Sequence, residues 1–549
     1  MNSKRVAGFV VAIVVVTLWL HWPAVQGKFL HWDDPLYLKN VAHWQKVSWS
    51  SVRWAFSTTG HDYYSPLTWL SYLIDHQTAG LDPHRFHATN VVIHALNTGV
   101  VGLLVWMIAA RSGAGPVARH GLVAGVALVF GLHPLQVESV AWVAERKNVL
   151  SSHFALWSLC AYLQAERTAR PKLWRSMALL LFALALLAKP QVMTLPLVML
   201  ALDLYPLRRW PATGWRRLIS EKTGFWLLSF ACGLLTVYAV FQVETPDPTT
   251  LAGIQQRCLV AMRGVIFYIW KLAWPAWLSP FYPLEGEISI RVPEFAVTTV
   301  LFLAVCGFAL RSVKRLPAWT SAWVAFLALL LPVIGLVQTG NQAAADRYMY
   351  LALLPLSLVA AAAVAGACRK CSVFLRSVLV VFVGCYLLFL AWTTRAQIPV
   401  WRNDLNLWHA AYQRFPESGY VNTALANALR RQGQLTDALP FAQRAVELAP
   451  QAGQARESLG VIHLLLGHYD DAVKELETAA QLNPRDLMVA YNLACAYSRH
   501  GQLSRAWEIL ERILPRRPDL AEVAARDVEL ADLRKDSVYG PRFTALLGE

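Results

Sequence analysis

The chain has 549 residues, of which 56% are apolar and only 15% are charged. Soluble domains carry about 25% charged residues, and the mean hydropathy is +0.38, so most of the chain is expected to lie in lipid. The net charge of +15 does not indicate nucleic-acid binding, because residues 1–394 hold 32 Lys and Arg against 16 Asp and Glu, whereas residues 395–549 hold 18 against 19. A basic excess confined to the apolar part is what the positive-inside rule produces.

Apolar stretches alternate with charged loops through the first part of the chain. Eleven of them have membrane-spanning character, and several fall short of the roughly 20 residues that cross a bilayer. They lie at residues 6–25, 88–110, 117–132, 148–165, 174–188, 190–206, 223–243, 293–310, 317–337, 349–366 and 375–394. Because no small-residue cleavage site follows the first stretch, we expect a retained anchor rather than a signal peptide.

The loops between these stretches predict the orientation. With a cytoplasmic N-terminus, the cytoplasmic loops hold most of the Lys and Arg residues and almost no acids, as the positive-inside rule requires. Eleven crossings then place residues 395–549 outside. Residues 257–280 would disturb this count if they crossed. Because they carry three cations, we expect them to form an amphipathic helix at the outer interface.

From residue 416 onward the sequence repeats every 34 positions. The residues that share this period are Pro416, Pro450, Pro484 and Pro518; Gly433, Gly467 and Gly501; Ala438, Ala472 and Ala506; and Leu425, Leu459 and Leu493. This period is typical of the tetratricopeptide repeat, a pair of closely packed helices. The sequence therefore predicts an α-solenoid over residues 395–549, whose groove would hold a peptide or protein.

Charged residues on the expected outer face are few, and they are the candidates for chemistry. The first outer loop, residues 26–87, contains Phe29-Leu-His-Trp-Asp-Asp-Pro-Leu-Tyr37. The candidates that follow are His133, Glu138, Trp142, Glu145, Arg146, Lys147, Lys189, Arg347 and Tyr348. Acids dominate the first two loops and cations the later ones, so a base and an anion-binding group are expected at one face.

Asp33 and Asp34 are adjacent, and neighbouring side chains point in different directions. Asp34 precedes Pro35, a pattern that favours an N-cap at the start of a helix. We therefore expect Asp33 to be the base and Asp34 to cap the helix. The alternative is that both are solvated loop acids.

In the second outer loop, Glu138, Trp142 and Glu145 recur at helical spacing, with Arg146 four residues after Trp142. A short helix would then gather acids, an aromatic ring and a cation on one flank, and the ring could support a sugar or an isoprenoid. The alternative is an interfacial helix with its usual aromatic anchor and basic residues.

Three stretches and the repeats together resemble a known family. They are Phe29–Tyr37, the stretch that begins His133-Pro-Leu-Gln-Val-Glu and runs to Ser151, and Asp346-Arg-Tyr-Met-Tyr350. In this order, and followed by tetratricopeptide repeats, they are similar to the transmembrane and tetratricopeptide-repeat O-mannosyltransferases (TMTC family). The resemblance covers nearly the whole chain.

The resemblance implies an all-α, polytopic membrane bundle of the GT-C type over residues 1–394 and a repeat domain over residues 395–549. It further implies inverting transfer of a sugar from a polyprenyl-phosphate donor to a Ser or Thr hydroxyl of an envelope protein, at the outer face of a bacterial inner membrane. Within GT-C enzymes the first outer loop supplies the catalytic acid, which corresponds to Asp33 with Asp34 beside it. Mannose as the sugar is left open.

Charge and location predict which groups contact the donor and the substrate. Arg146, Lys147, Lys189 and Arg347 are the candidates for the donor phosphate, with arginine favoured because its planar fork binds two oxygens. His133, Glu138, Trp142, Glu145 and Tyr348 are the candidates for substrate binding. We expect no metal site, since the spacing of His84, His87 and His94 fits no common ligand set and Cys368 and Cys371 have no second pair. A need for a divalent metal stays open.

Two alternatives to a protein glycosyltransferase remain at this stage. One is a membrane-anchored repeat scaffold without catalysis, which would have no use for acids and cations on the outer face. The other is a GT-C enzyme that acts on a lipid or polysaccharide. The repeats argue against this alternative, because such repeats usually bind peptides or proteins.

Overall fold

The computed structural model describes residues 3–43, 46–58, 64–243, 253–336 and 342–548. They are almost entirely helical and form two compact units, Met1–Asn403 and Asp404–Glu549. The predicted boundary at residues 394 and 395 falls inside a helix that runs from Val373 to Gln397, so the first unit continues nine residues further.

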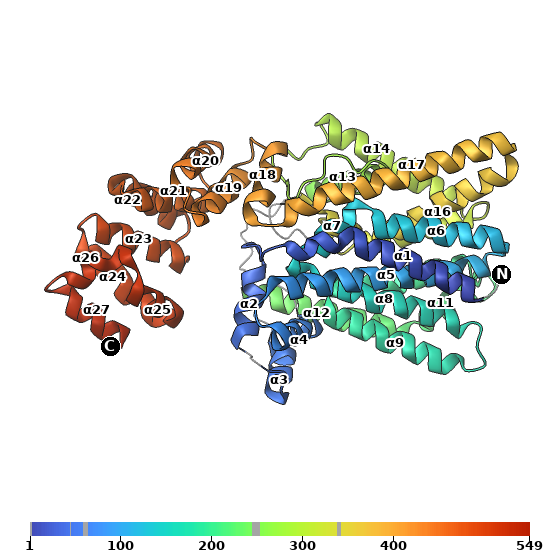
Figure 1. Ribbon diagram of the computed structural model, residues 1–549, viewed down its shortest axis with the longest axis horizontal. Helices are drawn as coiled ribbons and strands as arrows, with labels where there is room; N and C mark the ends of the chain where they lie inside the picture. The colour runs from blue at the N-terminus through green and yellow to red at the C-terminus, as the bar shows by residue number, and fades with distance from the viewer. Residues whose placement is uncertain (1–2, 44–45, 59–63, 244–252, 337–341, 549) are drawn as a thin grey trace. The chain divides into compact units, whose positions relative to one another are not determined.

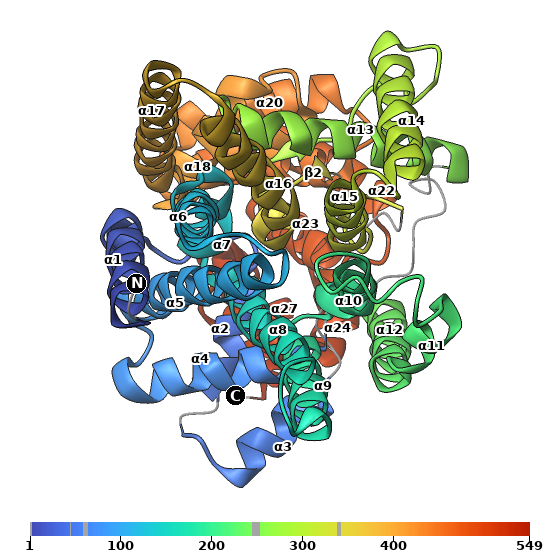
Figure 2. The ribbon, with the colours of Figure 1, turned by 90° about the vertical axis from the view of Figure 1, so that its right-hand side faces the viewer.

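The first unit is a bundle of long helices, several of which run side by side in Figure 1 and are seen closer to end-on in Figure 2. Its α-helices are α1 Ser3–His21, α2 Asp34–His43, α3 Trp49–Ser57, α4 Pro66–Ala79, α5 Pro83–Arg111, α6 Pro116–Leu132, α7 Val137–Ala141, α8 Arg146–Ala165, α9 Pro171–Ala188, α10 Leu195–Leu204, α11 Trp215–Ser220, α12 Thr223–Val243, α13 Ile254–Ala273, α14 Pro293–Ser312, α15 Pro317–Leu330, α16 Met349–Lys370 and α17 Val373–Gln397. Short 3-10 helices lie at η1 Trp22–Gln26, η2 Pro134–Gln136, η3 Val143–Glu145, η4 Pro190–Thr194, η5 Asp346–Tyr348 and η6 Ile398–Trp401.

Six helices of the described residues are long and apolar enough to cross a membrane, or seven if the bent pair Pro116–Leu132 and Pro134–Ala141 counts as one span. Three more apolar helices are shorter, at Pro190–Leu204, Thr223–Ala239 and Pro317–Leu330. Each of the eleven predicted stretches overlaps a helix, although the helix within 317–337 ends at Leu330 and residue 337 lies outside the described residues. The membrane-helix bundle is therefore confirmed, while the number of crossings stays a prediction.

The helix α13 covers most of residues 257–280, which were predicted to lie at the interface. It is 20 residues long but, with its three cations, is not among the helices apolar enough to cross a membrane, so its place at the interface stays a prediction. It also holds a neighbouring segment in place, because the Tyr268 hydroxyl donates to the Ala345 carbonyl (3.1 Å) and accepts from the Ala345 N–H (2.9 Å). Strand β1 (Tyr282–Pro283) pairs antiparallel with strand β2 (Gln342–Ala344), which leads directly into η5.

Apolar packing brings the ends of three helices together in the bundle. Leu20 of α1, Leu132 of α6 and Leu390 of α17 form one buried cluster. Beside it the Thr394 hydroxyl donates to the Leu132 carbonyl at 2.7 Å. Because α6 ends there, this cluster fixes the position from which the second outer loop starts.

The second unit consists of helical hairpins with the predicted 34-residue period. Its helices are α18 Asp404–Arg414, α19 Gly419–Arg431, α20 Leu435–Leu448, α21 Gly453–Leu466, α22 Tyr469–Leu482, α23 Leu487–Arg499, α24 Leu503–Ile513, α25 Pro518–Arg526, α26 Ala531–Lys535 and α27 Tyr539–Leu547, with 3-10 turns at η7 Leu514–Arg516 and η8 Val528–Leu530. The three periodic glycines all have φ between 76° and 83°, a conformation that strongly favours glycine.

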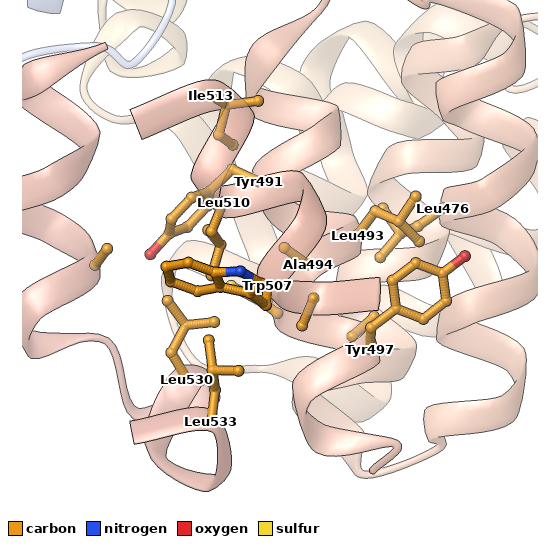
Figure 3. Packing of buried hydrophobic residues seen from close by; sticks show 14 of the residues in the cluster. Leu476, Tyr491, Leu493, Ala494, Tyr497, Trp507, Leu510, Ile513, Leu530 and Leu533 are labelled. Carbon is orange, nitrogen blue, oxygen red and sulfur yellow. The ribbon is translucent and has the colours of Figure 1, made fainter. Parts of the chain in front are cut away.

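The core of the second unit shows why the other periodic positions recur. Ala472 and Ala506 are fully buried where paired helices approach each other. Leu476, Leu493, Trp507 and Leu510 pack around them across α22, α23 and α24, as Figure 3 shows. The predicted α-solenoid is confirmed.

Candidate functional site

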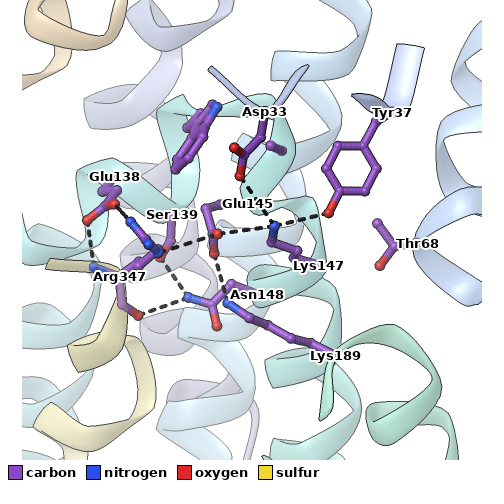
Figure 4. Close-up of polar contacts among 12 residues, drawn as sticks. Asp33, Tyr37, Thr68, Glu138, Ser139, Glu145, Lys147, Asn148, Lys189 and Arg347 are labelled. Carbon is purple, nitrogen blue, oxygen red and sulfur yellow. Dashed lines mark hydrogen bonds and ion pairs between the residues drawn. The ribbon is translucent and has the colours of Figure 1, made fainter. Parts of the chain in front are cut away.

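The ends of several helices bring one group of charged side chains together in the first unit (Figure 4). They come from four separate segments: the loop before α2, the second outer loop, the junction of α9 and η4, and the turn η5. The charged members are Asp33, Glu138, Glu145, Lys147, Lys189 and Arg347, which we call the open cluster. Three carboxylates and three cations in mutual contact leave it close to neutral.

Arg347 is bound to Glu138 through both its backbone and its side chain. Its N–H donates to one carboxylate oxygen at 2.8 Å, and its guanidinium binds the other oxygen. The guanidinium also lies 3.6 Å from Glu145, and its side chain is 11% exposed. The turn η5 is thereby attached to α7, and the Arg347 side chain stays partly exposed.

Glu145 lies at the centre of the cluster and contacts all three cations. Its oxygens lie 3.0 Å from Lys189 Nζ and 3.7 Å from Lys147 Nζ. Burial by itself would raise the pKa of this carboxyl, but the surrounding cations hold it below its usual range. Glu145 is therefore ionised at neutral pH.

Lys189 reaches the cluster because its backbone is fixed at the end of α9. The Thr68 hydroxyl donates to the Ala188 carbonyl at 3.0 Å, and the Ser151 hydroxyl donates to the Ala185 and Lys189 carbonyls. Burial lowers the pKa of Lys189 to about 8, although Glu145 opposes that shift. Its charge is thus sensitive to mildly alkaline pH.

Lys147 connects Glu145 to the first outer loop. Its Nζ donates to the Tyr37 hydroxyl at 3.0 Å and lies 3.9 Å from Asp33. Burial would lower the pKa of Lys147, but Tyr37 and the two neighbouring carboxylates hold it well above its usual range. The side chain of Asp33 is 27% exposed, the most of any charged member of the cluster.

Asp34 has surroundings quite unlike those of its neighbour. It is fully buried, and its two oxygens accept hydrogen bonds from the Leu30 N–H (2.7 Å) and the Ala144 N–H (2.9 Å). Burial raises the pKa of Asp34 to about 7, against the effect of these hydrogen bonds. The expectation that Asp34 caps its own helix is wrong, because both partners lie outside α2. It ties the first outer loop to the second.

Arg146 does not join the open cluster. Its guanidinium is fully buried and donates to Asp75 Oδ2 and to the Phe86 carbonyl, each at 2.7 Å, and to Asn90. It also lies over the Tyr72 ring. The prediction that Arg146 contacts the donor phosphate stays untested, and in this structure its guanidinium is bound to these buried partners instead. We call Arg146, Asp75 and Asn90 the closed cluster.

The expected single helix across the second outer loop is also wrong. The chain forms α7, turns to extended geometry at Trp142 (φ −94°, ψ 123°), passes through η3 and begins α8 at Arg146. The break separates the residues that were expected on one flank. Glu138 and Glu145 still meet, because both contact Arg347.

Trp142 and His133 are part of the core in this structure. Trp142 is 1% exposed and stacks on Trp32 and Trp401, with ring centroids 4.8 and 5.7 Å away. His133 is fully buried, and its ring lies 3.1 Å from the Leu272 carbonyl. The structure does not test the prediction that these two side chains contact substrate. Both instead support the loop that carries Glu138 and Glu145.

Tyr348 lies at the half-exposed edge of the open cluster, where the Arg347 guanidinium lies over its ring at 5.1 Å. The sequence reasoning missed Tyr37 and Asn148. The Asn148 side-chain amide donates to the Ser139 hydroxyl (2.8 Å) and to the Arg347 carbonyl (3.0 Å). Tyr37 stands four residues after Asp33 at the start of α2, a helical spacing that could have identified it. No comparable spacing in the sequence could have identified Asn148.

Within the described ranges, no three His, Cys, Asp or Glu side chains come together in an arrangement that could hold a metal ion. His94, one of the three histidines considered above, instead contacts the Tyr350 hydroxyl at 2.9 Å.

Comparisons with known proteins agree with this architecture. Residues 405–453, 423–486 and 463–525 match sequence models described as tetratricopeptide repeats. Human protein O-mannosyl-transferase TMTC1 is 23% identical over 511 residues, which cover 80% of this chain and 55% of that protein. The chain is similar to the TMTC proteins. Mouse protein O-mannosyl-transferase TMTC4 is 31% identical over 186 residues, 31% of this chain and 24% of that protein.

The predicted resemblance to the TMTC family is thereby confirmed. The chain spans about half the length of human TMTC1 and less of the other TMTC proteins described here. A solved structure, YrrB, described as a tetratricopeptide-repeat protein with an unusual peptide-binding site, covers 40% of this chain and 98% of its own at 20% identity and a TM-score of 0.21.

Proposed function

We propose that this chain is a membrane glycosyltransferase that moves a sugar from a polyprenyl-phosphate donor to a Ser or Thr hydroxyl of an envelope protein. The observation that carries the proposal is the open cluster. It places a partly exposed carboxylate and three cations together at the ends of membrane helices. The similarity to proteins named O-mannosyl-transferases supports the reaction class.

The acceptor side of the reaction needs a base, and Asp33 is the group suited to it. As the acceptor oxygen bonds to the anomeric carbon, its proton passes to the Asp33 carboxylate. Lys147, 3.9 Å away, places a positive charge beside that carboxylate. Asp34 is less suited to this task, because it is fully buried and both of its oxygens already accept backbone hydrogen bonds.

The donor side needs positive charge for the departing phosphate. The bond from the anomeric carbon to the phosphate oxygen breaks, and the polyprenyl phosphate leaves with the bonding electrons. Arg347 and Lys189 are the groups for this role, since oriented cations stabilise the charge that develops there. Glu138 and Glu145 hold both cations in place beforehand, which lowers the cost of ordering them when the donor binds.

An inverting displacement requires that the base and the leaving group act on opposite faces of the sugar. Figure 4 shows Asp33 and Arg347 on different sides of Glu145. The inverting mechanism is assigned on the resemblance to the GT-C class. The sugar itself is assigned as mannose only on the similarity to the TMTC proteins.

The repeats supply the protein acceptor in this proposal. Solenoids of this kind usually hold peptides or proteins in a groove. We place the protein in a bacterial inner membrane, with residues 404–549 facing the periplasm, on the basis of the basic loops. Reporter fusions after residue 403 should then appear periplasmic, and fusions at Arg216 or Arg315 cytoplasmic. A cytoplasmic repeat unit would overturn this orientation.

Mass spectrometry of envelope glycoproteins tests the proposed function. Cells that lack this chain should lose hexose-modified Ser and Thr peptides. Re-expression of the normal chain should restore those peptides, whereas the Asp33→Asn variant at equal abundance should not. If the glycopeptides are unchanged but a membrane glycolipid or polysaccharide disappears, the protein acceptor is wrong.

A further inference from the structure

A second feature of the bundle has its charged end far from the open cluster. A groove of about 720 Å³ runs between α5, α8 and α9, which lie side by side in Figure 1. Arg146 at the start of α8 contacts Phe86 near the start of α5, whereas the groove reaches Arg111 at the other end of α5. Twenty-five helical residues separate Phe86 from Arg111, which is roughly 37 Å at 1.5 Å per residue.

The walls of the groove are apolar and aromatic. Trp106, Trp157 and Trp174 line it with Phe154, Met177 and Leu181. Trp157 is 38% exposed and Met177 is 41% exposed, so the groove opens on the surface of the bundle. Its volume lies within the roughly 300–1,000 Å³ of sites for small organic molecules.

One end of the groove is positively charged. Arg111, the last residue of α5, donates to the Met107 and Leu163 carbonyls, and Arg167, just beyond α8, donates to the Ala110 carbonyl. Each arginine thus contacts the carboxyl end of the other's helix. Among the described residues neither forms an ion pair, and the nearby Glu166 pairs with Arg175 at 3.1 Å. The carboxyl ends of the two helices together carry only about one negative charge, whereas the two arginines carry two positive charges. This end of the groove therefore stays cationic.

We propose that this groove binds an anionic phospholipid, with an acyl chain along the tryptophans and the phosphate at Arg111 and Arg167. The charge selects the occupant, because basic pockets between membrane helices hold anionic headgroups. The tryptophans mark the depth at which headgroup and chain meet. The site is independent of the proposed transfer reaction, since none of its residues belongs to the open cluster.

Native mass spectrometry of the full chain tests the proposal. The protein is reconstituted in an equimolar mixture of phosphatidylcholine and phosphatidylglycerol, and the retained lipids are counted. The normal chain should retain phosphatidylglycerol preferentially. Arg167→Gln should reduce that preference roughly fivefold, and adding Arg111→Gln should reduce it by about the same factor again. Trp157→Ala should lower retention of either lipid.

The control is Arg216→Gln, which removes a cation that lies over Trp215, outside the groove. It should keep the preference of the normal chain. Arg167 is exposed, so its variant is expected to keep the normal melting temperature even if Arg111→Gln proves unstable. Equal retention of the two lipids by the normal chain would overturn the proposal, as would an equal loss in Arg167→Gln and Arg216→Gln.

Discussion

Arg146 and Lys147 are neighbours in the sequence, yet they belong to two charged clusters of different character. In the closed cluster, Arg146 is fully buried and Asp75 is 2% exposed. In the open cluster, side-chain exposure rises from 1% at Glu138 to 11% at Arg347 and 27% at Asp33. Buried charge alone therefore does not identify a functional site. The open cluster differs in being partly accessible, and its cations can bind a ligand.

The largest expected effect on stability lies in the closed cluster. Arg146→Met leaves Asp75 without its buried partner, and loss of one member of a buried pair costs about 3–5 kcal/mol. The matched control is Arg85→Met, because Arg85 also contacts Asp75 (3.3 Å) but is 47% exposed, where a pair contributes about 0–1 kcal/mol. Thermal melts compare the two variants. Equal losses of stability would mean that the burial of Arg146 does not strengthen its contact with Asp75.

The next effect concerns donor use in the open cluster. Arg347→Ala should reduce transfer at limiting donor about ten- to a hundredfold, because it removes a charge-assisted contact worth about 1.5–3 kcal/mol. Arg347→Lys keeps the charge and should recover part of the activity. The exposed Arg291→Ala is the control and should leave transfer unchanged. If Arg347→Ala used the donor normally, Arg347 would not bind its phosphate.

A smaller effect distinguishes a connecting role of Asp34 from helix capping. Asparagine caps a helix as well as aspartate does. The capping role expected from the sequence therefore predicts that Asp34→Asn loses little stability. The structure predicts a cost of about 1–3 kcal/mol, because one amide nitrogen would face a backbone N–H that now donates to a carboxylate oxygen. A melting temperature equal to that of the normal chain would restore the capping role.

The smallest effect follows from the pKa of Lys189, which burial lowers to about 8. As the pH rises through this value the ammonium loses its proton and its charge, so the KM for the donor should rise severalfold between pH 7 and pH 9. Lys189→Arg stays charged over this range and should remove that dependence. If the pH profile of Lys189→Arg matched that of the normal chain, the rise in KM with pH would come from another group.

Local periodicity made much of this structure predictable. Each of the eleven apolar stretches contains a helix, and the 34-residue period corresponds to the helical hairpins, since both patterns depend on neighbours along the chain. The positive-inside rule predicted which loops lie on the outer face and so which charged residues are site candidates. The structure brings five of them together: Glu138, Glu145, Lys147, Lys189 and Arg347.

The errors arose where orientation depends on distant contacts. A helix turns about 100° per residue, so a start at Arg146 directs it and Lys147 toward different neighbours. Asp34 finds its partner 110 residues away, at Ala144, and no local pattern reports such a contact. Likewise, Trp142 stacks on Trp32 and Trp401, which come from opposite ends of the first unit.

The most direct test of the account is a transfer assay on purified Asp33→Asn and Asp34→Asn, with the rate expressed per folded molecule and melts run on the same samples. Asp33→Asn should melt like the normal chain and lose about 100-fold or more of its transfer rate, the usual contribution of a general base. Asp34→Asn should melt earlier and keep most of its rate. Full activity in Asp33→Asn, or an inactive but stable Asp34→Asn, would contradict the assignment of Asp33 as the base.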